Sequence, residues 1–181
     1  TDDAQPVEIH ANNARVMRYE PNTVSPNVIG GSPANNVTAG VRGATIAGGG
    51  GPLGDTDPDV SNEAPNRVGD AYGTVGGGYA NQAGDGAGTA LDRAFATVGG
   101  GFNNTASGRS STVGGGLGNT ASGAGSTVGG GAGNTASATQ STVAGGGDNT
   151  ASGNASAVVG GAFNTASGDY SVALGRRAGA L

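Results

Sequence analysis

Small apolar residues recur every 15 positions through the second half of the chain. In each unit a threonine or a smaller substitute precedes a valine, and a glycine cluster follows it. The valine column comprises Val98, Val113, Val128, Val143 and Val158, and it continues as Ala173. Asparagine, alanine and serine form three further columns with the same spacing. A fixed short period of this kind predicts one structural unit that is stacked many times.

A 15-residue unit is too short for a helical hairpin repeat, and its apolar positions lack the 3.6-residue spacing of a helix. The pattern instead predicts an all-β fold, a parallel β-solenoid or β-roll with 15-residue coils. Each coil would contain about two short strands and two turns, and coils would stack at about 4.7–4.9 Å. We expect the five valines and the alanine column to line the interior. The asparagine column predicts either a hydrogen-bonded ladder or repeated turns, and both roles are compatible.

A second column predicts contact with another chain. It lies two residues after each threonine position, on the strand face opposite the valines. Its members are Gly99, Gly114, Gly129, Ala144, Val159 and Leu174. The face becomes more apolar toward the C-terminus, because Thr142 is followed in its own column by Ala157 and Val172. We therefore expect an intertwined or side-by-side homotrimer, with an isolated flat-faced solenoid as the alternative.

The repeat divides the chain into three segments. Residues 97–181 form the regular array, and residues 26–96 are predicted to form irregular coils with side loops at 52–70 and 84–93. Residues 1–25 read differently, with two short strands predicted around the turn-forming pair Asn12 and Asn13. This N-terminal segment would cap the first coil or, as the alternative, contact another subunit.

Composition limits the possible functions. With 40 glycines in 181 residues, and only 4% aromatic and 12% charged residues, the chain cannot assemble a large conventional core. The net charge is −5, all eight basic residues are arginines, and they form no cluster, so nucleic-acid binding is not expected. The chain has no cysteine and no apolar stretch of the roughly 20 residues that would span a membrane.

Few residues are suited to catalysis or metal binding. His10 is the only histidine, and Arg109 and Asp148 are the only ionisable side chains between residues 97 and 168, so we expect no enzyme. One acidic run resembles a calcium loop in its alternation; it comprises Asp55, Asp57 and Asp59. The usual turn glycine is absent from it, so a solvated acidic loop is the alternative, and no other cofactor is expected.

Three asparagines meet the N-glycosylation pattern, namely Asn36, Asn103 and Asn154. Such triplets also arise by chance in a chain rich in asparagine, serine and threonine, so a bare surface is the alternative.

Several segments resemble known bacterial families. The segment DYSVALGRRAGA, residues 169–180, resembles the S-V-A-I-G signature of trimeric autotransporter adhesin heads. NNARVMRYEPN, SPNVIGG, ATIAGGGG and ATVGGGFNNTASG resemble bacterial secreted and phage-tail-fibre-like glycine-rich repeat proteins. The resemblance implies a parallel β-roll trimer, and full-length proteins of this kind often carry a C-terminal intramolecular chaperone domain. The glycine triplets replace the bulky residues of adhesin heads.

These observations together predict a non-catalytic, extracellular structural protein that forms a rigid trimeric fibre, stalk or filament segment. Its partner would be further copies of the same chain. An adhesin or receptor-binding fibre that recognises a surface glycan through its side loops is the alternative. An ice-binding solenoid is a third reading, because regular threonine columns can order water. It is disfavoured by the loss of threonine at Ala157 and Val172.

Overall fold

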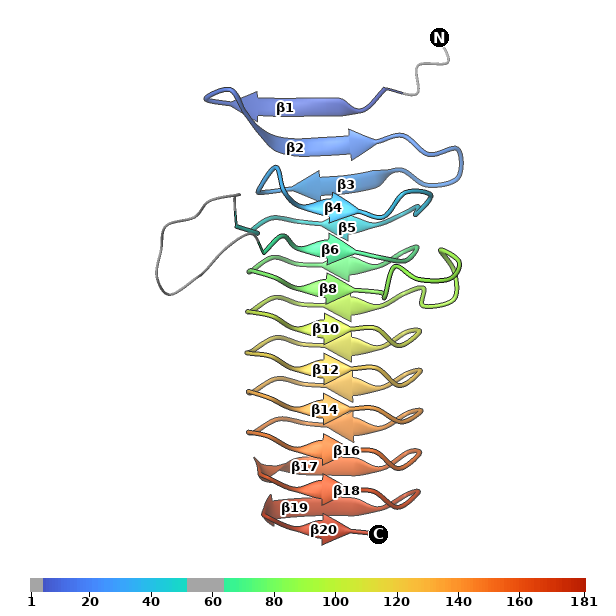
Figure 1. The fold of residues 1–181 in the computed structure, drawn as a ribbon, viewed down its shortest axis with the longest axis vertical. Coiled ribbons are helices and arrows are strands. Elements are labelled where there is room, and N and C mark those ends of the chain that lie inside the picture. Colours follow the sequence, from blue (N-terminus) through green and yellow to red (C-terminus); the bar gives the residue numbers. More distant parts are fainter. Residues whose placement is uncertain (1–4, 52–63) are drawn as a thin grey trace.

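The computed structural model describes residues 5–51 and 64–181, and every regular element in this part of the chain is a β-strand. The strands wind into a parallel β-solenoid of about nine turns with about 15 residues per coil, as the repeat predicts (Figure 1). The described residues therefore contain no helix that could cross a membrane.

Two sheets run along the rod. The first, which we call the valine sheet, has 11 strands in the order β1-β2-β3-β5-β7-β9-β11-β13-β15-β17-β19. The bounds of these strands are Val7–Ala11, Ala14–Glu20, Asn27–Gly30, Thr45–Ile46, Thr74–Val75, Thr97–Val98, Thr112–Val113, Thr127–Val128, Thr142–Val143, Ala157–Ala162 and Val172–Arg176. The second, the alanine sheet, has nine strands in the order β4-β6-β8-β10-β12-β14-β16-β18-β20. Their bounds are Asn36–Val37, Arg67–Val68, Gln82–Ala83, Thr105–Ala106, Thr120–Ala121, Thr135–Ala136, Thr150–Ala151, Thr165–Ala166 and Gly179–Ala180.

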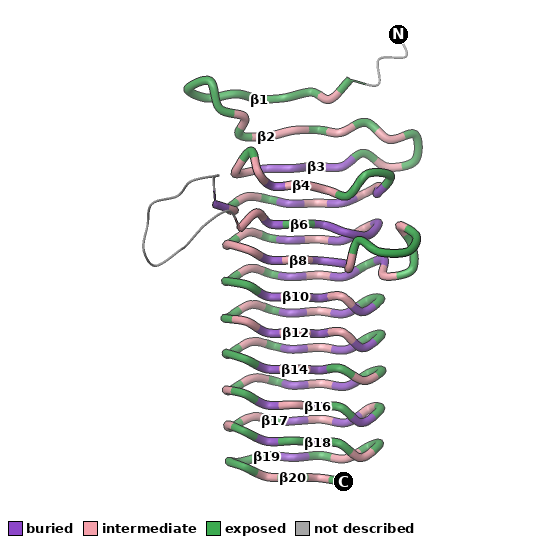
Figure 2. The backbone as a smooth tube through the Cα atoms, in the orientation of Figure 1, coloured by how far each residue is buried: buried purple, intermediate pink, exposed green. Residues whose placement is uncertain are grey.

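Identical residues stack on one another because the parallel register advances by one repeat per coil. Val113 pairs with Val98 and Val128 in the valine sheet. Ala121 pairs in the same way within the alanine sheet. The valines of one sheet and the alanines of the other are buried and belong to one hydrophobic core cluster. Figure 2 shows the buried positions recurring in successive coils along the rod. Valine and alanine fill this core, with Ile29 and Ile46 in the first coils.

A buried asparagine ladder runs the length of the solenoid. Its members are Asn35, Asn66, Asn81, Asn104, Asn119, Asn134, Asn149 and Asn164. The backbone N–H of Asn119 donates to Oδ1 of Asn104 at 3.0 Å, and that of Asn134 donates to Oδ1 of Asn119 at 3.0 Å. The Nδ2 group of Asn119 donates to the carbonyls of Gly115 and Gly131, both at 2.9 Å. The ladder thus satisfies backbone groups at a corner where the chain leaves the strand conformation, which confirms the ladder expectation.

Each glycine triplet contains a position that tolerates no side chain. Gly116 adopts a φ of 95°, which residues with a Cβ rarely adopt. A Cβ at this position would overlap the carbonyl oxygen of Gly131 in the next coil and approach Nδ2 of Asn119 to 2.8 Å. The glycine therefore lets the coils approach closely enough for the asparagine ladder to form.

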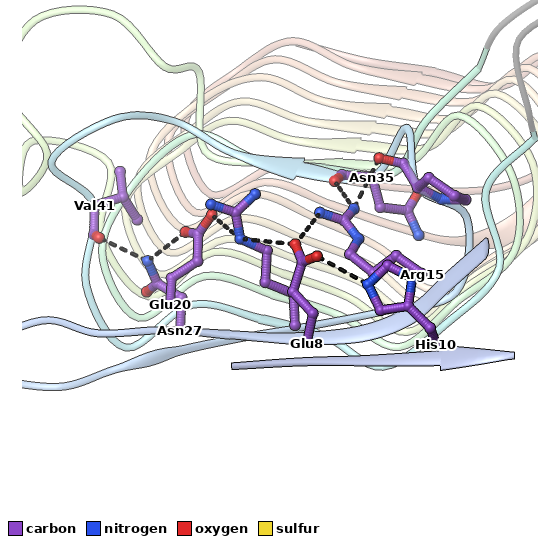
Figure 3. A network of polar contacts seen from close by, with 9 residues as sticks. Glu8, His10, Arg15, Glu20, Asn27, Asn35 and Val41 are labelled. Atoms are coloured by element: carbon purple, nitrogen blue, oxygen red, sulfur yellow. Dashed lines mark hydrogen bonds and ion pairs between the residues drawn. The ribbon is translucent and has the colours of Figure 1, made fainter. Parts of the chain in front are cut away.

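An antiparallel hairpin precedes the solenoid. β1 and β2 pair around Asn12 and Asn13, which have φ values of 48° and 59°, and β2 then pairs with β3 of the first coil. Nη2 of Arg15 donates to the carbonyl of Pro33 at 2.7 Å and ties the hairpin to the coil below (Figure 3). The hairpin continues the valine sheet and leaves β1 as its edge strand.

The boundary of the first predicted side loop needs correction. The loop was expected over residues 52–70, but residues 67–68 form β6 and Asn66 belongs to the asparagine ladder. Asp70 is buried just after this strand. The coil therefore resumes before residue 70, because the asparagine and the inward-facing Val68 restore the repeat pattern there.

Candidate interaction surface

The column predicted to pack between chains lies on the outer face of the valine sheet. All six members are exposed in the single chain: Gly99, Gly114, Gly129, Ala144, Val159 and Leu174. For the glycines, a Cβ would overlap the carbonyl oxygen of the following coil, as Gly114 would with Gly129. Stacking within one chain therefore already accounts for glycine in the early coils, and the case for a partner chain depends on the apolar residues that follow.

Those later residues form an apolar patch on the last two coils. Val159 of β17 is 58% exposed, and Val172 and Leu174 of β19 are 56% and 66% exposed. The two strands are hydrogen-bonded neighbours, so the three side chains share one outer face of the valine sheet. We call these three residues the C-terminal apolar patch. Exposed large apolar side chains on one face of a sheet are typical of an interaction surface.

The hairpin at the other end also exposes apolar side chains. Val7 and Ile9 lie on β1, and Val16 and Tyr19 lie on β2; all four are exposed. Because β1 is an edge strand, its outer backbone groups have no strand neighbour within residues 5–51 and 64–181 of the single chain. The exposed large apolar side chains of the valine sheet therefore lie at its two ends.

Two aromatic stacks mark the corners of the early coils, and the sequence reasoning did not identify them. The rings of Tyr72 and Phe95 stack at a centroid distance of 5.3 Å, and those of Tyr79 and Phe102 stack at 5.6 Å. Each pair joins successive coils across the inserted side loop. The sequence signal is the shared spacing of 23 residues, which equals one repeat plus the insertion.

A polar cleft lies beside the second side loop, at 84–93. Its lining consists of Thr38, Arg67, Gly69, Gln82, Asp85 and Gly86. Arg67 and Gln82 come from the outer face of the alanine sheet, and Asp85 and Gly86 come from the loop. The cleft therefore forms where the loop leaves the rod.

The other sequence candidates are an acidic run and three sequon asparagines. Asp55, Asp57 and Asp59 lie outside the described residues. Among the sequon asparagines, Asn36 is half-buried in β4, whereas Asn103 and Asn154 are exposed.

Neither His10 nor the threonine column lines the polar cleft. The Nε2 atom of His10 lies 3.0 Å from Oε2 of Glu8 in the exposed hairpin (Figure 3). The outward threonines of the valine sheet, Thr97, Thr112, Thr127 and Thr142, are half-buried in the single chain. They lie beside the glycine column and lead along the same face toward the C-terminal apolar patch.

No protein-family model matches the chain, and no curated protein is similar to it.

Proposed function

We propose that the chain is a structural element that forms a rigid, extracellular, homotrimeric rod without catalytic activity. The observation that supports this most is the C-terminal apolar patch on the outer face of the valine sheet. Val159, Val172 and Leu174 are each more than half exposed in the single chain. Contact with the same face of two further chains would remove these side chains from water. In a closed ring of three, every copy would bury its patch in the same way.

The internal construction of the rod supports a mechanical role. Each coil hydrogen-bonds to its neighbours through both sheets and through the asparagine ladder, so the backbone is satisfied along the axis. The core is continuous, and the paired strands are short and closely stacked. Such a rod holds whatever is attached to its ends at a fixed separation.

The test is a charge placed in the proposed interface. Leu174→Arg would put three like charges close to the trimer axis, whereas Thr150→Arg places the same charge on the outer face of the alanine sheet. We expect Leu174→Arg to sediment as a monomer with an unchanged far-UV circular dichroism spectrum, and Thr150→Arg to remain trimeric. If both variants sediment like the parent chain, the valine sheet is not the interface.

A receptor-binding role for the side loops is the second candidate, and the polar cleft beside loop 84–93 favours it. Arginine, glutamine, threonine and aspartate side chains line this cleft, and such groups hydrogen-bond the hydroxyls of a glycan. A glycan array probed with the parent chain and with Arg67→Ala tests the idea. Binding that depends on Arg67 supports it, and binding that is absent or unaffected by the substitution contradicts it.

A further inference from the structure

Three aspartates from different parts of the sequence meet where the second side loop joins the rod. Asp70 follows β6, and Asp85 and Asp92 lie in or near the two ends of the loop at 84–93. One carboxylate oxygen from each residue lies within 4.8 Å of those of the other two. This distance is short enough for all three to contact a single ion, because calcium–oxygen bonds are about 2.3–2.6 Å long.

Asp70 is the buried member of this cluster, and its hydrogen bonding is incomplete. The residue is 1% exposed. Its Oδ2 atom accepts hydrogen bonds from the backbone N–H groups of Asp85 at 2.9 Å and Gly86 at 3.3 Å. Its Oδ1 atom is buried and has no hydrogen-bond partner among the described residues. A buried carboxylate oxygen without a partner is costly and rare, so this atom is a candidate cation ligand.

The local charge is also unbalanced. Nε of Arg93 lies 3.3 Å from Oδ2 of Asp85, and among the described residues this is the one ion pair that the three aspartates form. Burial raises the pKa of Asp70 above its ordinary value, the carboxylates of Asp85 and Asp92 raise it further, and the two backbone N–H groups lower it. Three carboxylates with one guanidinium leave an excess of two negative charges, which matches one divalent cation.

The loop backbone comes close to the carboxylates. Gly84, with a φ of 82°, would place a Cβ 2.5 Å from Oδ2 of Asp70, and Gly88, with a φ of 67°, would place one 2.7 Å from Oδ2 of Asp92. Glycine at these two positions thus allows the loop backbone to pass close to the carboxylates.

We propose that Asp70, Asp85 and Asp92 bind one divalent cation, calcium in preference to magnesium, and that the ion fastens the side loop to the coil. Carboxylate oxygens are preferred ligands of hard cations. Calcium is favoured over magnesium because an irregular loop site does not impose the strict octahedral geometry that magnesium requires. Its three residues are not those of the acidic run, which comprises Asp55, Asp57 and Asp59.

The experiment is isothermal titration calorimetry of the full chain with Ca²⁺ after EDTA treatment and removal of the chelator, with Mg²⁺ as the comparison. Asp92→Asn changes the proposed ligand whose carboxylate, among the described residues, accepts no hydrogen bond from the backbone, unlike those of Asp70 and Asp85. Asp148→Asn is the matched control, because it removes the same charge from an exposed position in the regular coils. A triple substitution of Asp55, Asp57 and Asp59 to asparagine separates the proposed site from the acidic run.

The expected result is one Ca²⁺ bound per chain, with Kd raised at least tenfold by Asp92→Asn and changed less than twofold by Asp148→Asn and by the triple substitution. Circular dichroism verifies that each variant is folded. Three results would overturn the proposal: no Ca²⁺ binding by the parent chain, equal binding by Asp92→Asn, or loss of binding in the triple variant alone. In the first case a proton shared among the carboxylates would account for the unpaired oxygen.

Discussion

Truncation of one rung of the asparagine ladder should destabilise the rod far more than truncation of an exposed asparagine. Asn119 lies in the middle of the regular coils and is fully buried. In Asn119→Ala, the backbone N–H of Asn134 loses its acceptor, which is now 3.0 Å away at Oδ1. The carbonyl of Gly115 loses the Nδ2 donor that lies 2.9 Å from it. The carbonyl of Gly131 stays satisfied, because it also accepts from the N–H of Leu117.

Two backbone groups are therefore left without partners, the buried N–H of Asn134 and the part-buried carbonyl of Gly115. A buried group without a partner costs about 1–3 kcal/mol and a part-buried one costs less, so the loss in unfolding free energy should be about 2–4 kcal/mol. This is a large share of the total for a domain whose stability is about 5–15 kcal/mol. The matched control is Asn154→Ala, because Asn154 is exposed and its Nδ2 donates only to Oδ1 of Asp169, at 3.1 Å. There the loss should stay below about 1 kcal/mol.

Urea unfolding, followed by far-UV circular dichroism at one fixed protein concentration, measures both losses. The concentration is fixed because association contributes to the apparent stability of an oligomer. If Asn119→Ala and Asn154→Ala differ by less than 1 kcal/mol, the ladder does not stabilise the stack and the reasoning fails.

Two further predictions concern the same coils. Gly116→Ala should lower the unfolding free energy by at least about 2 kcal/mol, because the residue has a φ of 95° and its Cβ would overlap the carbonyl of Gly131. Gly130→Ala should be tolerated, because a Cβ there would lie 3.8 Å from the carbonyl oxygen of Gly115. Equal melting temperatures for these two variants would contradict the close-approach argument. Ser126→Ala should leave the unfolding free energy unchanged or raise it slightly, because the buried hydroxyl has no hydrogen-bond partner among the described residues. Ser111→Ala should lower it by about 1 kcal/mol, because the hydroxyl loses its 2.7 Å hydrogen bond to the carbonyl of Gly108. Urea midpoints for the serine pair test this ranking, which fails if Ser126→Ala is the more damaging change.

The regular part of the fold was predictable because each structural role recurs at one spacing. Val128 and Asn119 occupy columns of identical residues, and in a parallel stack identical residues must lie above one another. Local sequence therefore defined the core, the ladder and the direction of stacking.

The parts that the sequence did not predict are those near the insertions. Tyr72 and Phe95 stack across a 23-residue interval, which a search at the 15-residue period passes over. Asp70 and Asp85 are 15 residues apart and share a column, but Asp92 joins them only through the path of the loop. The first side loop, predicted over residues 52–70, ends earlier in the structure, because Asn66 already belongs to the ladder. The irregular spacing of the early coils concealed this position.

The most direct test of the trimeric rod is small-angle X-ray scattering of the parent chain at several concentrations, since it reports mass and axial length together. A side-by-side trimer should show three times the 16.9 kDa chain mass. Its rod should be as long as one solenoid, which has about nine coils at about 4.8 Å per coil, plus the N-terminal hairpin. A particle of one chain mass, or a particle of three chain masses that is three times as long, would contradict the account.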